Sequence, residues 1–144
     1  MGPDFNPMPT AEGWQCSNPN IFSLAALRSS LDLFERAGGM AKLRAKSVQL
    51  TGYLEFLLDQ RLAGKVTSMT PRDPDRRGSQ LSLVLNTLRL GAEVSPGPAL
   101  IEHLAAAGVT VDWREPNVIR VAPTALYNRF SDVYHLVGVL EDVL

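Results

Sequence analysis

Apolar residues recur every three or four positions between residues 40 and 62, and this period predicts one long helix. The recurring positions form a single stripe, and Gly64 stands where such a helix would end. The stripe consists of Leu43, Ser47, Leu50, Thr51, Leu54, Leu57 and Leu58. The charged positions of the same segment are expected to form its solvated face, and they are Lys42, Arg44, Lys46 and Glu55.

Three more helices are predicted from shorter stripes and from their boundary residues. The first begins at Asn18-Pro19, because asparagine caps helices well and proline is favoured at the first helical position, and it ends at Gly38-Gly39. Another is opened by Ser95-Pro96 and closed by Gly108. The last begins at Ser131 or Asp132, and its apolar positions are Val133, Leu136, Val137, Leu140 and Leu144.

Four segments are predicted to be strands, namely 66–70, 80–85, 109–113 and 117–122. Apolar residues alternate along the second and third of them, and Ile119 and Val121 point to one face of the fourth. Pro71 and Pro123 end the first and the last of them, because proline lacks a backbone N–H. The polar run 72–78 is expected to be a solvated hairpin loop rather than a nucleic-acid contact, since aspartates lie among its arginines. The order of elements predicts an α+β fold in which helices cover one face of a mostly antiparallel four-strand sheet.

The first 20 residues follow neither period. Three of the first nine residues are prolines, while Phe5 and Trp14 are large apolar groups that need cover. We therefore expect residues 1–20 to be an irregular segment that packs on a surface outside this chain, and residues 21–144 to form the domain.

Composition narrows the classes of function. The chain has 144 residues, 45% hydrophobic and 20% charged, as in one soluble globular domain. Its net charge of −1 gives no reason to expect a nucleic acid or an anionic membrane as partner, and no apolar run approaches the roughly 20 residues of a membrane span. One cysteine and an N-terminus unlike a signal peptide favour the cytoplasm. His103 and His135 have no second ligand at metal-binding spacing, so no metal is predicted.

The main candidate for chemistry is Arg120, the one cation within the apolar strand 117–122. A guanidinium held on a strand suits a carboxylate or a phosphate, because its planar fork offers two parallel hydrogen bonds. The alternative is an ordinary solvent-facing arginine on the wet face of a sheet. Asn18 is a second candidate, because a helix N-terminus offers free N–H groups to an anion such as a phosphate. A plain capping role is the simpler interpretation of this residue, and the two roles are compatible.

Four groups of residues, taken together and in order, resemble the C-terminal third of kynureninase. They are Gly13-Trp14-Gln15-Cys16-Ser17-Asn18-Pro19, Leu50-Thr51-Gly52-Tyr53-Leu54, Thr70-Pro71 leading to Arg77-Gly78-Ser79-Gln80-Leu81, and Asn117-Val118-Ile119-Arg120-Val121-Ala122-Pro123 with Leu126-Tyr127-Asn128. The resemblance runs through essentially the whole chain. It implies the small domain of a fold-type I pyridoxal-phosphate (PLP) enzyme, preceded by a segment at the large-domain or dimer interface.

Kynureninases are homodimers that use PLP in tryptophan catabolism. They hydrolyse L-kynurenine or 3-hydroxykynurenine to L-alanine and anthranilate or 3-hydroxyanthranilate. The resemblance implies that Arg120 binds the substrate α-carboxylate and that Asn18 approaches the cofactor of the partner subunit. Family members often have a second proline where this sequence has Asn20, a difference expected to move only the start of the helix.

The family's Schiff-base lysine lies upstream of the matched segment, and the three lysines present, Lys42, Lys46 and Lys65, are predicted on a polar helix face and in a turn. We therefore expect the intact enzyme to be a kynureninase and this chain alone, as a fragment, to be inactive. Two alternatives remain, the small domain of a cysteine desulfurase-like enzyme and a non-catalytic dimerisation or interaction module. The motifs around Asn18 and Arg120 argue against the first, and nothing in the sequence separates kynurenine from 3-hydroxykynurenine as substrate.

Overall fold

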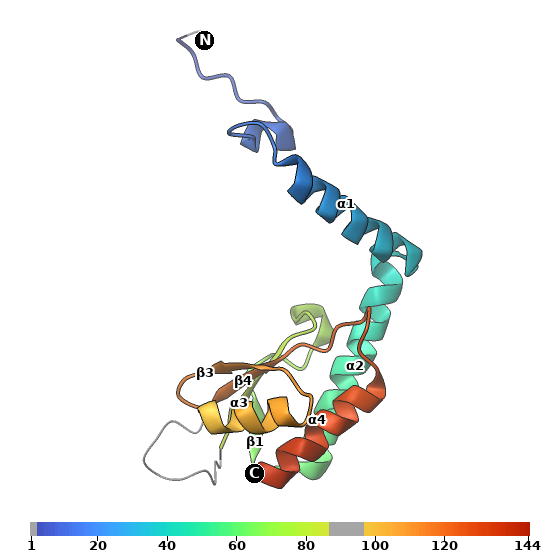
Figure 1. Cartoon of the computed structure of the whole chain (residues 1–144), viewed down its shortest axis with the longest axis vertical. Coiled ribbons are helices and arrows are strands. Elements are labelled where there is room, and N and C mark those ends of the chain that lie inside the picture. Colours follow the sequence, from blue (N-terminus) through green and yellow to red (C-terminus); the bar gives the residue numbers. More distant parts are fainter. Residues whose placement is uncertain (1–2, 87–96) are drawn as a thin grey trace.

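The computed structural model describes residues 3–86 and 97–144 (Figure 1). Its elements in chain order are η1 (Ala11–Trp14), α1 (Ile21–Arg36), α2 (Gly39–Arg61), β1 (Val66–Ser68), η2 (Pro74–Arg76), β2 (Leu81–Leu85), α3 (Gly97–Ala106), β3 (Asp112–Arg114), β4 (Val118–Val121) and α4 (Phe130–Val143). The predicted order of helices and strands is therefore confirmed. None of these helices combines the length and the apolarity needed to cross a membrane.

The four strands form one antiparallel sheet in the order β1-β2-β4-β3, so β4 lies between β2 and β3. Because side chains alternate along a strand, the register divides the sheet into two faces. One face carries the buried side chains Leu81, Leu83, Leu85, Ile119 and Val121. The other face carries Thr67, Ser82, Val84, Asp112, Arg114, Val118 and Arg120. The predicted α+β class is confirmed.

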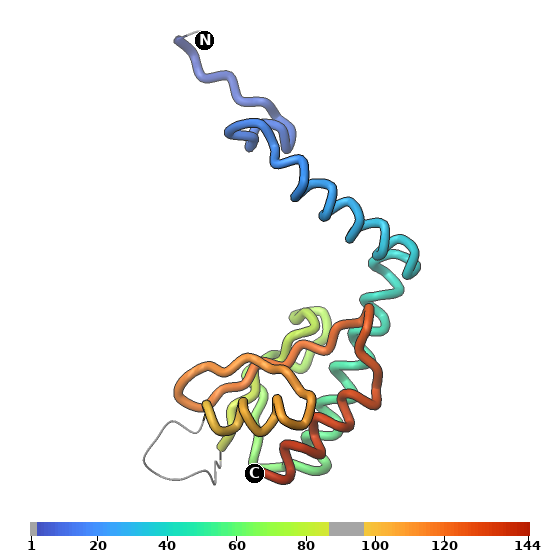
Figure 2. Tube along the Cα trace, in the orientation of Figure 1, coloured from blue at the N-terminus to red at the C-terminus, as the bar shows by residue number. Residues whose placement is uncertain are grey.

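The core lies between the leucine face of the sheet and the helices α2, α3 and α4. The predicted stripe of α2 is its buried face, residue for residue. All five apolar positions predicted for the last helix are buried as well. Arg61 ties α2 to α4, because its Nε donates to Glu141 at 2.8 Å and its guanidinium lies 4.8 Å from the Tyr134 ring centroid. The trace in Figure 2 shows α2 and α4 running side by side.

The segment before α2 lies outside this core. Helix α1 extends away from the sheet and its covering helices, and the N-terminal segment continues beyond it (Figure 1). No residue described between 3 and 36 is buried, and Phe5, Trp14 and Phe22 are each about 90% exposed. The predicted irregular segment contains one short helical turn, η1. Its packing on a surface outside the chain, and the boundary at residue 21, stay predictions.

The predicted start of the first helix was wrong. Asn20, not Asn18, caps α1, and its side chain accepts a hydrogen bond from the Ser23 backbone N–H at 3.1 Å. Both asparagines can cap, but a helix begun at Asn18 would place Asn20 in its first turn, where asparagine is less favourable than at the cap. Pro19 consequently precedes the cap. Asn18 lies in the exposed segment before it.

Several other boundaries differ by a few residues. Strand β1 ends at Ser68, and β3 begins at Asp112, because the Val109 N–H is still bonded to Leu104 in the turn that closes α3. Helix α4 begins at Phe130, since Asp132 acts from the third helical position, where it accepts from the Arg129 N–H at 2.9 Å. The predicted opening of α3 at residues 95–96 lies outside the described residues.

Candidate functional site

Arg120 lies in the middle of β4, the strand between β2 and β3, and faces away from the core. Its chain neighbours Ile119 and Val121 are buried on the opposite face, so they fix the direction in which the arginine points. Ser82 of β2 and Asp112 of β3 are its direct neighbours across the sheet. The structure therefore places the predicted receptor on a strand that is paired on both sides, on the face that α2, α3 and α4 leave uncovered.

Asp112 holds the guanidinium along one edge. One oxygen of this carboxylate, Oδ2, accepts from Arg120 Nε at 2.5 Å and forms an ion pair with Arg120 Nη2. The same oxygen accepts from Arg114 Nε at 3.0 Å. The hydrogen bond from Arg120, helped by the charges of both arginines, holds the pKa of Asp112 below its ordinary value. Sequence reasoning missed Asp112, since only the register places it beside Arg120.

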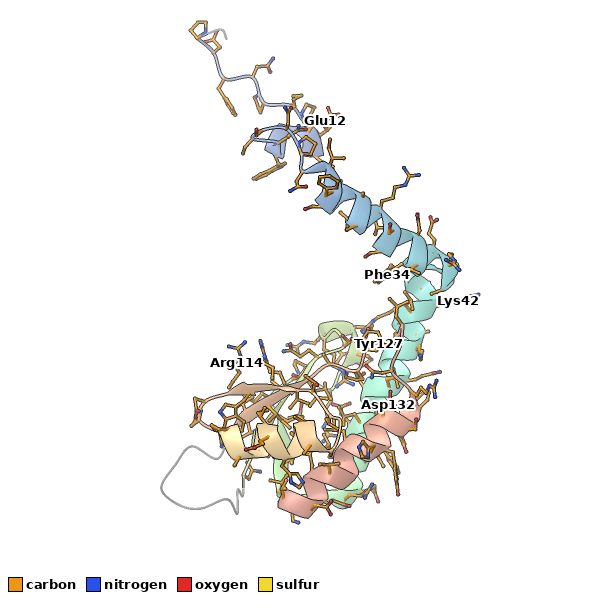
Figure 3. All side chains as sticks on the ribbon, viewed as in Figure 1. Glu12, Phe34, Lys42, Arg114, Tyr127 and Asp132 are labelled. Atoms are coloured by element: carbon orange, nitrogen blue, oxygen red, sulfur yellow. The ribbon has the colours of Figure 1, made fainter. Side chains whose placement is uncertain are left out.

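The remaining edge of the Arg120 guanidinium is accessible. About 35% of the side chain is exposed, and within the described residues its Nη1 has no hydrogen-bond acceptor. Two arginines share one aspartate here, so the cluster of Arg114, Asp112 and Arg120 carries a net charge of +1. In Figure 3 the Arg114 side chain points away from α3, toward the open side of the sheet. This arrangement can bind one carboxylate or phosphate group.

The loop after β4 is held by short side-chain contacts. Asn128 Oδ1 accepts from the Thr124 N–H at 2.7 Å, and Asn128 Nδ2 donates to Asp132 at 3.2 Å. Lys46 donates to the Ala125 carbonyl at 2.7 Å, so this lysine is not on a fully solvated helix face as predicted. Tyr127 remains exposed (Figure 3).

A pocket of about 390 Å³ lies beside this loop. Its lining includes Pro123 and Asn128 but not Arg120.

The loop between β1 and β2 is also less solvated than predicted. Arg77 forms a bidentate ion pair with Glu55 of α2, and the two side chains are only 3% and 11% exposed. Arg44 donates to the Pro74 carbonyl, whereas Arg72 and Asp59 form an exposed pair. The prediction of a solvated face was wrong for Arg44 and Glu55, because the loop folds back over α2 and forms hydrogen bonds with both side chains. These contacts hold the loop that leads into β2 against α2.

The second predicted site residue is not near the first in one copy of the chain. Asn18 precedes α1, which leads away from the sheet that carries Arg120 (Figure 1). Its predicted contact with a cofactor stays a prediction.

The described residues do not provide the lysine of a complete PLP site. Lys42 is exposed, Lys46 is engaged with a carbonyl, and Lys65 is half-buried in the turn before β1, so none is the buried, free lysine that binds this cofactor. The described residues also contain no group of three or more histidine, cysteine, aspartate or glutamate side chains that could hold a metal ion. Cys16 is a free, exposed thiol.

A family model described as "Kynureninase C-terminal domain" matches residues 43–140. The kynureninases of Stenotrophomonas maltophilia and Myxococcus xanthus are each 55% identical to the chain over 141 residues, which are 98% of this chain. The same residues are 32% and 31% of those two proteins, so the chain spans about a third of the length of these curated relatives.

Solved structures show the same fold at much lower identity. A cysteine desulfurase from Thermococcus onnurineus NA1 matches with a TM-score of 0.72 and 17% identity, covering 92% of this chain and 33% of that one. A C-DES mutant with glycine covalently linked to the PLP cofactor matches with a TM-score of 0.62 and 19% identity, covering 79% and 27%. These likenesses confirm the predicted small-domain fold of a fold-type I PLP enzyme.

Proposed function

Because the chain belongs to the kynureninase family, within which it matches the C-terminal domain, we propose that it supplies the substrate-carboxylate receptor of a kynureninase. The reaction is hydrolysis of L-kynurenine or 3-hydroxykynurenine to L-alanine and anthranilate or 3-hydroxyanthranilate, in tryptophan catabolism. The observation that carries this proposal is Arg120, fixed at the centre of the sheet on its uncovered face, with one edge of the guanidinium accessible.

Arg120 binds the α-carboxylate of the amino-acid substrate through that accessible edge. A bidentate contact orients the substrate as well as attracting it, so the Cα–H and the side-chain bonds are held in a fixed direction. PLP, bound mainly by residues outside this chain, supplies an electron sink for the bonds at Cα when it is present. The part of this chain is to hold the amino acid in place for that chemistry.

Asn18 serves the second subunit of a homodimer. The support is geometric, because α1 leads the segment with Asn18 away from the sheet of its own chain, and its side chain has no hydrogen-bond partner within the described residues. An exposed amide on such an extension is free to reach a cofactor held by a partner. The exposed apolar side chains of the same segment would then pack at the large-domain or dimer interface, in the cytoplasm.

The 144-residue chain alone does not catalyse the reaction, because none of its lysines has the setting that the cofactor requires. Turnover of kynurenine by the purified chain with added PLP would contradict this statement. A non-catalytic interaction module remains the second candidate for the isolated chain. It is favoured by the setting of the same three lysines and by α1, in which no residue is buried.

The decisive experiment is Arg120→Lys in an intact kynureninase that carries these 144 residues as its C-terminal part. Lysine keeps the charge but loses the planar fork, so we expect KM for kynurenine to rise at least about tenfold and kcat to fall. Arg72→Lys is the matched control, because Arg72 forms an exposed ion pair outside the sheet, and it should leave both constants unchanged. An unchanged KM in the Arg120 variant would refute the assignment, whereas activity toward cysteine would favour a cysteine desulfurase-like enzyme.

A further inference from the structure

We propose that Asp112 is a positioning residue for Arg120, which fixes the guanidinium so that its opposite edge is presented to the substrate carboxylate. This inference rests on the proposed function of Arg120. The juxtaposition that carries it is the direct cross-strand pairing of Asp112 and Arg120 on the open face of the sheet.

The contact geometry leaves the receptor edge free. Asp112 Oδ2 occupies the side of the guanidinium formed by Nε and Nη2. A guanidinium is planar, so a carboxylate on that side fixes the orientation of the whole group. Nη1 and the outer hydrogen of Nη2 then point away from Asp112, and they are the two donors that a bidentate ligand needs.

The charge of the cluster explains why Asp112 does not simply neutralise the receptor. A lone Arg120–Asp112 pair would be neutral, and a substrate carboxylate would have to displace the aspartate to gain a cationic partner. Arg114, which donates to the same oxygen of Asp112 at 3.0 Å, restores a net charge of +1. The substrate can therefore bind beside Asp112 instead of in its place.

An aspartate across from an arginine could also serve only to pair the edge strand β3 with β4. The two roles predict different measurements. A purely structural pair affects the melting temperature but not the kinetic constants of the enzyme that remains folded. A positioning pair affects the binding of ligands that carry an α-carboxylate, and it does so only while residue 120 is an arginine.

The test uses an intact kynureninase carrying this chain, with the variants Asp112→Ala and Asp112→Asn made alone and in the Arg120→Lys background. Asparagine has nearly the size of aspartate and keeps an oxygen that can accept from Arg120 Nε, so this variant remains informative if the alanine variant does not fold. Asp59→Asn is the control, because Asp59 is likewise paired with an arginine, through both of its carboxylate oxygens, but outside the sheet. KM for L-kynurenine, Ki for the product L-alanine and the melting temperature are measured for each protein.

We expect Asp112→Ala to raise KM and the Ki of alanine by about tenfold, with Asp112→Asn raising them less and Asp59→Asn leaving them unchanged. In the Arg120→Lys background, the further effect of Asp112→Ala should shrink to less than about threefold, because the fork that it orients is gone. Lower melting temperature with unchanged KM and Ki in both Asp112 variants would overturn the proposal, and so would a lower KM, which would make Asp112 a competitor of the substrate. If Arg120→Lys alone leaves KM unchanged, the proposed function fails and not only this inference.

Discussion

The buried ion pair between Glu55 and Arg77 provides the sharpest test of how the loop between β1 and β2 is held. Glu55 accepts from Arg77 through both oxygens, and the two side chains are 11% and 3% exposed. Asp59 and Arg72 form a similar bidentate pair between the same helix and the same loop, with bonds of 2.6 and 2.7 Å, but they are 48% and 65% exposed. The two pairs therefore differ mainly in burial.

We predict that Glu55→Gln lowers the free energy of unfolding by about 3 kcal/mol, because it leaves the buried Arg77 charge without its counter-charge. Asp59→Asn should cost less than about 1 kcal/mol, as exposed pairs usually do. Arg77 Nε is buried and has no acceptor among the described residues, so the pair is incompletely satisfied. We therefore expect the double variant Glu55→Leu with Arg77→Met to recover most of the loss, since apolar residues often replace a buried pair without cost.

The measurement is urea unfolding of the 144-residue chain, followed by far-UV circular dichroism and by tryptophan fluorescence. Trp113 is half-buried against the core, while Trp14 is 89% exposed, so the change in fluorescence reports on the sheet. A double-mutant cycle gives the coupling energy of each pair. Equal costs for Glu55→Gln and Asp59→Asn, with coupling near zero for both, would refute the reasoning that burial decides the strength of the pair.

Three further predictions test the core, the helix cap and the effect of pH. Leu54→Ala should cost about 2–5 kcal/mol in the same unfolding experiment, because Leu54 is fully buried and its truncation leaves a cavity. Asn20→Ala should reduce the helicity of α1 by circular dichroism while Asn18→Ala does not, and the reverse result would restore the predicted cap. A hydrogen bond from the backbone N–H of Arg129 holds the pKa of the Asp132 carboxyl below its ordinary value. The cap of α4 should therefore stabilise the chain fully above the pKa that Asp132 has in the unfolded chain, and this stabilisation should be lost as the pH falls through its pKa in the folded chain. An NMR titration that gives Asp132 an ordinary or raised pKa would contradict this prediction.

The fold could be predicted largely because burial in this chain follows simple periods. The stripe of α2 and the alternation in β2 and β4 identify the buried residues without any knowledge of the tertiary structure. The ends of the helices were less predictable, since more than one residue near an end can serve as the cap. Asn18 and Asn20 can each begin α1, and only the hydrogen bond to Ser23 decides between them.

The candidate site could be predicted only in part, for a related reason. Arg120 stands out because it interrupts an apolar strand, which is a local signal. Asp112 gives no such signal, because it becomes a neighbour of Arg120 only through the antiparallel register of β3 and β4. Glu55 and Arg77 were assigned to solvent for the same reason, since they are 22 residues apart and meet only when the loop folds over α2.

Successive side chains of β4 point to opposite faces of the sheet, so the residues that stabilise the fold and the residue proposed to bind the substrate are neighbours in sequence. Ile119 and Val121 face the core and are buried, so their truncation removes packing. Arg120 between them faces the uncovered side and contributes little to that packing, yet its direction depends on both neighbours remaining in place. A receptor on a central strand thus gains rigidity from side chains that never touch the ligand, and the sheet has to leave one face uncovered for the receptor to be reached. An uncovered face is therefore what the function proposed here requires of this sheet, and the helices α2, α3 and α4 leave one.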